Sequence, residues 1–233
     1  MNTPPFSETQ QPPDSLEVAV SQAIAACFSA IERSTYRLVV DLRFPELRQM
    51  PIAYQFARAL TERYGDRWQG IFPDAGAAAL AQRDWSDIPI KLRGVNEGRR
   101  LTAEDKDLFL LIAPSSVELE QVEKLAQLVS DRPLIMLNPQ LENMEVGIGL
   151  ATRRMRERFL NTFETAYYLQ PLEAGFVWRC YPQTWQVWAE GQCLRELLSK
   201  PTPEELQRIF APQTGKKFSF LDQLQTLFNF LNR

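Results

Sequence analysis

Four arginines crowd one short stretch of the sequence, and arginine is well suited to binding anions. They are Arg153, Arg154, Arg156 and Arg158. A guanidinium group donates hydrogen bonds in a planar fork that fits carboxylates and phosphates. One interpretation is therefore an anion-binding surface on a helix capped by Thr152. The alternative is that these arginines pair with carboxylates such as Glu157 and Glu164, or are simply solvated.

A second group of candidate residues follows stretches that are typical of buried strands. It consists of Asp74, Gly76, Ser115, Ser116 and Asn138. In open parallel sheets, ligands bind beyond the carboxyl ends of the strands, often with an anion against a helix N-terminus. A phosphorylated ligand would then contact Gly76, Ser115, Asn138 and Arg153. The alternative is that Asp74, Ser115 and Ser116 only cap the helices that follow them, and Asp74 would repel a phosphate on its own helix.

The chain has no histidine among its 233 residues. Without imidazole it cannot form a Ser-His-Asp or Cys-His nucleophile system, a zinc site that uses histidine, or a histidine proton shuttle. Cys27, Cys180 and Cys193 are far apart and form no C-x-x-C pair, which predicts neither a disulfide framework nor a sulfur-ligated metal. We therefore expect no catalytic residue, no metal and no cofactor, although an enzyme that uses Asp, Glu, Tyr or Arg alone stays open.

The net charge and the glycine pattern argue against two further classes of protein, nucleic-acid binders and dinucleotide-binding proteins. The 29 acidic and 26 basic side chains leave a net charge of −3, which argues against a nucleic-acid binder. The segment Gly147-Ile148-Gly149 lacks the third glycine of a dinucleotide-binding loop and lies about ten residues after the preceding strand. We do not expect it to bind a nucleotide.

The elements that must position these residues alternate along the chain. Apolar runs predict strands over residues 36–42, 68–72, 89–95, 108–113 and 134–137. Helical spacing predicts helices after Asp14 and Ser15, over residues 52–64 and 75–82, and after a capping box at Ser115–Glu118. The arginine-rich segment is expected to be one more helix, packed through Phe159, Phe163, Tyr167 and Tyr168. This alternation predicts an α/β fold, a Rossmann-like three-layer domain with a mostly parallel sheet, over residues 14–170.

The two ends of the chain differ from this core. The proline-rich residues 1–13 are expected to be a disordered tail. Residues 171–233 are expected to form an aromatic hairpin from 176–181 and 185–189, a helix capped by Thr202, and a terminal helix over 219–231. The apolar face of the terminal helix would pack on its own sheet or dock on a partner or an acidic membrane surface.

Two patterns in the sequence bear on the location of the protein. No lysine or arginine precedes Arg33, and the longest apolar run, Leu108 to Pro114, is far shorter than the roughly 20 residues of a membrane-spanning helix. We therefore expect neither a secretory leader, a transit peptide nor a transmembrane segment, and a cytoplasmic location.

An ordered series of motifs resembles one known family over about residues 14–210. The motifs are Phe72-Pro73-Asp74-Ala75-Gly76 with Arg83-Asp84-Trp85, Ala113-Pro114, Leu137-Asn138-Pro139, Arg156-Glu157-Arg158-Phe159-Leu160, Thr162-Phe163-Glu164, Ala166-Tyr167-Tyr168-Leu169, and Arg179-Cys180-Tyr181-Pro182 with Trp185. The family is the domain of unknown function nineteen ninety-five of cyanobacteria and chloroplasts. Its relatives include a low photosystem II accumulation factor and a domain fused to a plastid adenylate kinase.

This resemblance implies a non-enzymatic photosystem assembly or accumulation factor of a cyanobacterium. Such a factor would act by protein–protein contact with a photosystem subunit or assembly protein, as a cytoplasmic protein with peripheral contact to the thylakoid. The alternative is a module that binds a nucleotide or phosphorylated small ligand at the carboxyl edge of the strands. The family's motifs add Tyr167, Arg179, Tyr181 and Trp185 to the candidate surface. An Asn-Pro pair can equally end a strand, and a Tyr-Pro pair can equally shape a turn.

Overall fold

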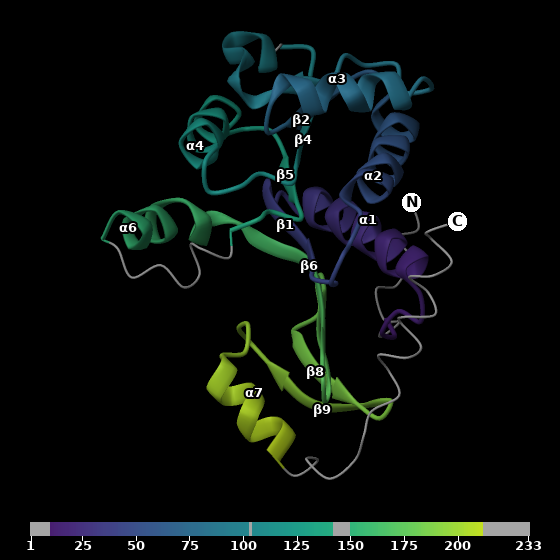
Figure 1. The fold of residues 1–233 in the computed structure, drawn as a ribbon, viewed down its shortest axis with the longest axis vertical. Coiled ribbons are helices and arrows are strands. Elements are labelled where there is room, and N and C mark those ends of the chain that lie inside the picture. The colour runs from purple at the N-terminus through teal and green to yellow at the C-terminus, as the bar shows by residue number, and fades with distance from the viewer. Residues whose placement is uncertain (1–9, 103, 142–149, 212–233) are drawn as a thin grey trace.

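Nine strands form one continuous sheet in the computed structural model, which describes residues 10–102, 104–141 and 150–211 (Figure 1). The strands are β1 (Arg37–Leu42), β2 (Trp68–Phe72), β3 (Arg93–Gly94), β4 (Leu108–Ile112), β5 (Leu134–Leu137), β6 (Glu164–Leu172), β7 (Gly175–Cys180), β8 (Trp185–Ala189) and β9 (Gln192–Leu197). Their order across the sheet is β3-β2-β4-β5-β1-β6-β7-β8-β9. The pairings from β3 to β6 are parallel, and those from β6 to β9 are antiparallel.

Helices cover both faces of the sheet. They are α1 (Leu16–Glu32), α2 (Gln49–Tyr64), α3 (Ala75–Asp84), α4 (Leu119–Leu128), α6 (Leu150–Arg158) and α7 (Pro203–Phe210), with the 3₁₀ turns η1 (Val95–Leu101) and η2 (Leu160–Thr162). Alternate residues of β1 and β4 point to opposite faces, because successive side chains of a strand alternate. Leu38, Val40 and Leu110 pack with α1, α2 and α3, whereas Val39 and Leu111 pack with α4 and α6.

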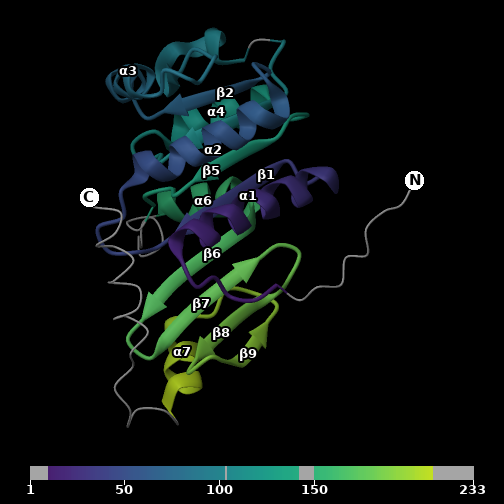
Figure 2. The same ribbon diagram turned by 90° about the vertical axis from the view of Figure 1, so that its right-hand side faces the viewer.

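Helices α4, α6 and α7 lie on the same side of the sheet, opposite α1 and α2 (Figure 1, Figure 2). Helix α7 packs on the antiparallel strands through Leu206 and Phe210, which contact Val187 and Ala189 of β8. The sheet face over β1 and β6 therefore lies between α6 and α7.

The predicted α/β fold with a mostly parallel sheet is confirmed. Strands β2 and β5 have their predicted bounds, and β4 is buried along its whole length, as its continuous apolar run predicts. Gly65 follows α2 with a φ of 62°, a backbone conformation that glycine adopts at little cost, so it ends that helix. Thr202 and Glu205 form the predicted capping box of α7.

The prediction that Tyr167 and Tyr168 pack the arginine-rich helix is wrong. Helix α6 ends at Arg158, and the chain enters strand β6 at Glu164. Strand β6 pairs with β1 on one side and β7 on the other, so Tyr167 and Tyr168 point to opposite faces and both become buried. Strand pairing on both edges outweighs the helical spacing of the aromatic residues.

Smaller corrections concern element bounds. The strand predicted over residues 89–95 is confined to Arg93–Gly94. Helix α4 begins at Leu119, several residues after the predicted cap Ser115, whose backbone N–H and hydroxyl both donate to the Glu118 carboxylate, at 2.9 and 2.7 Å. The predicted hairpin forms as β7 and β8, and it continues the main sheet with β9 as a further strand.

Some predicted features lie outside the described residues, namely the terminal helix over 219–231, the Gly147-Ile148-Gly149 segment and residues 1–9 of the tail. The described end of the tail lies against α1, where the Gln11 carbonyl accepts a hydrogen bond from the side chain of Gln22 at 2.9 Å. Among the described helices, none has both the length and the apolar character needed to cross a membrane.

Candidate functional site

Strands β1 and β5 are parallel neighbours whose following helices lie on opposite faces of the sheet. The chain leaves β1 toward α2, which packs with α1, and it leaves β5 toward α6, which packs with α4. Such a change of direction opens a crevice beyond the carboxyl ends of the two strands, the usual place for a ligand in an open α/β sheet.

A cleft of about 750 Å³ occupies this position, and we call it the switch crevice. Its lining residues come from the ends of β1, β4, β5 and β6 and from the start of α2. They are Asp41, Leu42, Arg43, Phe44, Pro45, Gln49, Ser115, Ser116, Val117, Asn138, Pro139, Gln140, Gln170 and Pro171. Amides and hydroxyls dominate its polar groups, so it offers both donors and acceptors of hydrogen bonds.

Asn138 organises the crevice, although it is almost fully buried. Its side-chain oxygen accepts a hydrogen bond from the backbone N–H of Leu42 at 2.8 Å, and its side-chain nitrogen donates to Gln49 at 2.7 Å. Its φ is 46°, in the left-handed region that asparagine tolerates better than most residues. One side chain thus ties together the ends of β1 and β5 and the first turn of α2.

A second cavity of about 330 Å³ adjoins the crevice on the sheet face between α6 and α7, and we call it the sheet groove. The two cavities share Asp41, Arg43 and Pro139. The other residues of the groove are Val39, Met136, Leu141, Arg156, Leu160, Asn161, Thr165, Tyr168, Trp185 and Lys200. Val39 and Asp41 are alternate residues of β1 and therefore face the groove together, and Arg43, which follows the end of the strand at Leu42, also lines it.

Basic and aromatic side chains meet in the groove. The Arg43 Nε donates to the Asp41 carboxylate at 2.7 Å, and the Arg43 guanidinium lies 5.7 Å from the Tyr168 ring centre. The Lys200 ammonium lies 4.7 Å from the same ring. Cations are attracted to the faces of aromatic rings, so Tyr168 helps to position both side chains.

Five of the predicted candidate residues line these cavities. Ser115, Ser116 and Asn138 line the switch crevice, and Arg156 and Trp185 line the sheet groove. Arg179 lies beside the groove, where its guanidinium is 5.3 Å from the Trp185 ring centre and pairs with Glu164.

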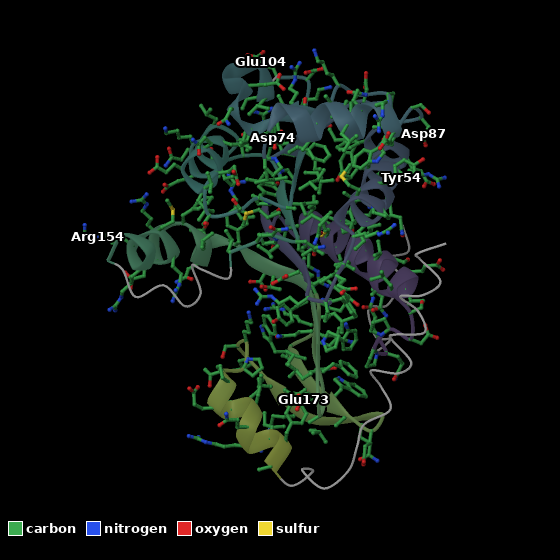
Figure 3. The ribbon with its side chains drawn as sticks, viewed as in Figure 1. Tyr54, Asp74, Asp87, Glu104, Arg154 and Glu173 are labelled. Carbon is green, nitrogen blue, oxygen red and sulfur yellow. The ribbon has the colours of Figure 1, made fainter. Side chains whose placement is uncertain are left out.

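The other candidates do not join the site. Asp74 caps α3 by accepting from the Ala77 N–H at 2.9 Å, and Gly76 lies in the first turn of that helix (Figure 3). The Tyr167 hydroxyl donates to Gln22 on the opposite face of the sheet, and burial raises the pKa of this phenol. Tyr181 packs with the residues of that same face.

Two candidate arginines also lie outside both cavities. Arg153 pairs with Glu157 at 2.9 Å on the exposed side of α6. Arg154 is exposed and points away from the sheet at the outer end of α6 (Figure 3).

Sequence reasoning missed Asp41, Arg43, Gln49 and Lys200. Asp41 carried a readable signal, because an acidic residue beside the apolar residues of a strand needs a partner when it is buried, and Arg43 lies two positions later in the sequence. Gln49 and Lys200 carried no such signal, because the segments that bring them to the cavities are far apart in the chain.

The cavities together can hold a polar ligand by hydrogen bonds and by positive charge. Among residues 10–102, 104–141 and 150–211, no three cysteine, aspartate or glutamate side chains are placed to hold a metal ion. In a comparison with known families, the chain matches the model of a family described as a domain of unknown function, over residues 13–208. The matched residues include every residue that lines the crevice and the groove.

Proposed function

Because the chain belongs to the DUF1995 family, a domain of unknown function, we propose its role from the site that the family match contains. We infer that the protein is a binding module for a small polar ligand with a negative charge, of the class of nucleotides and phosphorylated metabolites. The ligand lies across the switch crevice and the adjoining sheet groove.

The observation that carries this proposal is the position of the crevice. It lies between β1 and β5, beyond their carboxyl ends, where the following helices go to opposite faces of the sheet. Polar side chains from four separate segments converge there, including Asp41, Gln49, Ser116 and Asn138. A small number of polar groups that converge in a concave site is typical of a ligand-binding pocket.

The side chains of the crevice favour binding over bond cleavage. Asp41 is held by the guanidinium of Arg43, and the Ser115 hydroxyl donates to Glu118 within its own turn. The chain has no histidine that could serve as a general base beside a serine. The other polar side chains that line the crevice are amides and hydroxyls.

Thermal unfolding with a panel of adenine nucleotides, dinucleotides and sugar phosphates tests this proposal. A ligand at 100 times its Kd should stabilise the protein by about 2.7 kcal/mol. Ser116→Trp places a bulky side chain in the crevice and should abolish the shift. Leu128→Trp, at an exposed position on α4 outside both cavities, should keep it. The absence of a shift with every compound, or a shift that Ser116→Trp leaves unchanged, would contradict the proposal.

A second candidate function is photosystem assembly. Here the protein would contact a photosystem subunit or assembly protein at the cytoplasmic surface of the cyanobacterial thylakoid, as the family resemblance implies. The structural observation that favours it is the outer edge of β9, which pairs with no described strand, followed directly by Leu198, which is 93% exposed. An open strand edge beside an apolar side chain suits the addition of a partner's strand.

Deletion of the gene, with separate measurement of the two photosystems, tests this second function. One photosystem should fall in abundance, and the wild-type chain should restore it. Leu198→Asp should restore it poorly, whereas Leu128→Asp, at another exposed leucine, should restore it fully. Unchanged levels of both photosystems in the deletion strain would argue against the assembly role.

A further inference from the structure

The hydrogen bonds of the switch crevice decide which end of the Gln49 amide a ligand meets. An amide side chain has an oxygen, which only accepts hydrogen bonds, and a nitrogen, which only donates them. The end that faces a cavity therefore sets the kind of group that the cavity can bind. For Gln49 this choice follows from two bonds, the first of which starts at a backbone N–H group.

The first bond orients the amide of Asn138. The backbone N–H of Leu42 can only donate, so the side-chain atom of Asn138 that lies 2.8 Å from it must be the oxygen. The backbone N–H of Asn138 in turn donates to the Val40 carbonyl at 2.7 Å, and the residue is buried. The Asn138 amide is thus held in one orientation, with its nitrogen directed to Gln49.

The second bond orients the amide of Gln49. The Asn138 nitrogen can only donate, so the Gln49 atom that lies 2.7 Å from it must be the oxygen Oε1. Gln49 belongs to the first turn of α2, which is anchored in the core by the buried residues Ile52, Ala53 and Phe56. A ligand in the crevice, which Gln49 lines, therefore meets the nitrogen Nε2 with its two N–H groups.

Two more polar side chains of the crevice are engaged through their oxygens. The Tyr168 hydroxyl donates to the side-chain oxygen of Gln170 at 2.6 Å, so the nitrogen is again the end that meets a ligand. The Ser115 hydroxyl donates to Glu118 at 2.7 Å, and its oxygen accepts from the Val117 N–H at 3.2 Å. The oriented amides of the crevice thus present donors, and a ligand has to match them with acceptors.

Apolar side chains form other parts of the crevice wall. Val117 is 79% exposed, and Pro45 and Pro171 line the same cavity of about 750 Å³. This volume lies within the usual range of pockets for small molecules. A flat heterocyclic ring suits such a site, because its faces contact apolar side chains while its edge forms hydrogen bonds with amides.

Resting on the ligand-binding function proposed above, we propose that the switch crevice holds the base of a nucleotide and that Gln49 Nε2 donates to a carbonyl oxygen of that base. A carbonyl oxygen only accepts, so it matches the oriented amide. An amino group at the same position would place two donors face to face. Gln49 thus selects a base with an oxo group, such as hypoxanthine or uracil, over one with an amino group, such as adenine or cytosine. Asn138 is a positioning residue that acts through Gln49.

Isothermal titration with two pairs of nucleotides tests this selection. Inosine monophosphate and adenosine monophosphate differ by an oxo or an amino group at the same position of the purine. Uridine and cytidine monophosphate differ in the same way at the pyrimidine. In each pair the wild-type chain should bind the oxo member about tenfold more tightly, the effect of one matched hydrogen bond. Both members carry the same phosphate, so their ratio of affinities does not depend on the charge of the protein.

Two variants should each reverse this preference. Gln49→Glu keeps an oxygen for the Asn138 nitrogen and presents a second oxygen, an acceptor, to the ligand. Asn138→Asp keeps an oxygen for the Leu42 N–H but replaces the nitrogen by another acceptor, so the Gln49 amide has to turn and present its own oxygen to the ligand. Both variants should therefore bind the amino member of each pair more tightly. A merely structural role of Asn138 would weaken both members alike and leave their ratio unchanged.

The matched control is Gln55→Glu, at a half-buried glutamine of the same helix outside both cavities, which should keep the wild-type ratio. Thermal unfolding reports whether each variant is folded, and Gln49→Glu alone decides the matter if Asn138→Asp does not fold.

Four results would overturn the inference. They are no binding of any of the four nucleotides to the wild-type chain, equal affinities within the pairs, a wild-type preference for the amino members, and a wild-type ratio in Gln49→Glu. If a compound of the thermal panel still stabilises the protein and Ser116→Trp abolishes that shift, the ligand-binding function stands and only the selection of an oxo base falls.

Discussion

The side-chain oxygen of Asn138 accepts a hydrogen bond from the backbone N–H of Leu42 at 2.8 Å, so the residue after β5 holds the end of β1. This bond continues the contact between the two strands beyond their last paired residues, Val40 and Leu137, at the point where the switch crevice begins. Because Asn138 is only 4% exposed, water cannot easily replace the bond.

Replacement of Asn138 should destabilise the fold. Asn138→Ala leaves the Leu42 N–H unpaired, at a cost of about 2 kcal/mol, and places alanine in the left-handed region, at a further cost of about 1 kcal/mol. Asn138→Gly removes the amide but tolerates the positive φ, so it should be the less destabilised variant. Urea unfolding measures both, and equal stability of Asn138→Ala and the wild type would contradict this role.

Arg37 should be a stabilising residue outside the site. Its guanidinium donates to four backbone carbonyls, those of Tyr36, Ala126, Val129 and Arg132, of which Ala126 and Val129 lie in the last turn of α4 or just beyond it. Burial lowers the pKa of Arg37, but an arginine stays charged at neutral pH.

Arg37→Met should therefore cost about 2–3 kcal/mol, because it leaves carbonyl groups near a helix end without a charged donor. Arg37→Lys keeps the charge and should recover only part of this loss, because one ammonium cannot reach all four oxygens. Chemical unfolding compares the three chains. If Arg37→Lys matched the wild type, charge alone and not the fork of donors would explain the effect.

Gly94 and Gly76 should respond differently to alanine. A Cβ on Gly94 would lie 2.6 Å from the Ala75 nitrogen, at the start of α3, and backbone cannot move away as a side chain can. Gly94→Ala should therefore destabilise the contact between β3 and α3 by roughly 1–3 kcal/mol, the usual range for overpacking. A Cβ on Gly76 would meet only the Asp74 carboxylate oxygen at 3.0 Å, so Gly76→Ala should cost much less. Thermal unfolding of the two variants checks this order.

The three cysteines should differ in reactivity at pH 8. Cys193 is exposed on β9, whereas Cys27 and Cys180 are buried. Burial raises the pKa of Cys180 to about 12 and that of Cys27 well above its usual range, so almost no thiolate is present at either. Mass spectrometry after brief treatment with iodoacetamide should find one modified cysteine in the native protein and three in urea. Rapid modification of Cys27 in the native protein would contradict its burial.

Much of the fold could be predicted because its signals are local. Asp74 and Thr202 predict the starts of helices, and the apolar runs of β4 and β5 predict strands that are buried on both faces. Strand β6 could not be predicted in this way, because Phe159, Phe163 and Tyr167 recur at helical spacing. Its conformation depends on pairing with β1 and β7, and this information is not contained in the segment itself.

The site could be predicted only in part, for a similar reason. Ser115 and Asn138 follow apolar strands, and ligands bind beyond the carboxyl ends of parallel strands. The sequence therefore predicts that these two residues lie at the crevice. Lys200 follows a solvent-exposed strand and precedes an ordinary helix cap, and only the docking of α7 brings it to Tyr168. The charge of the groove is therefore a property of tertiary packing.

The place of β1 in the sheet also sets the order in which the protein can fold on the ribosome. Its two neighbours, β5 and β6, come late in the sequence. The first strand to be synthesised must therefore wait for Leu134–Leu137 before one edge is paired and for Glu164–Leu172 before the other is paired. Contacts between such distant segments slow folding and leave apolar edges open meanwhile. A nascent chain of this protein therefore exposes an apolar strand without both of its neighbours until β6 has been synthesised.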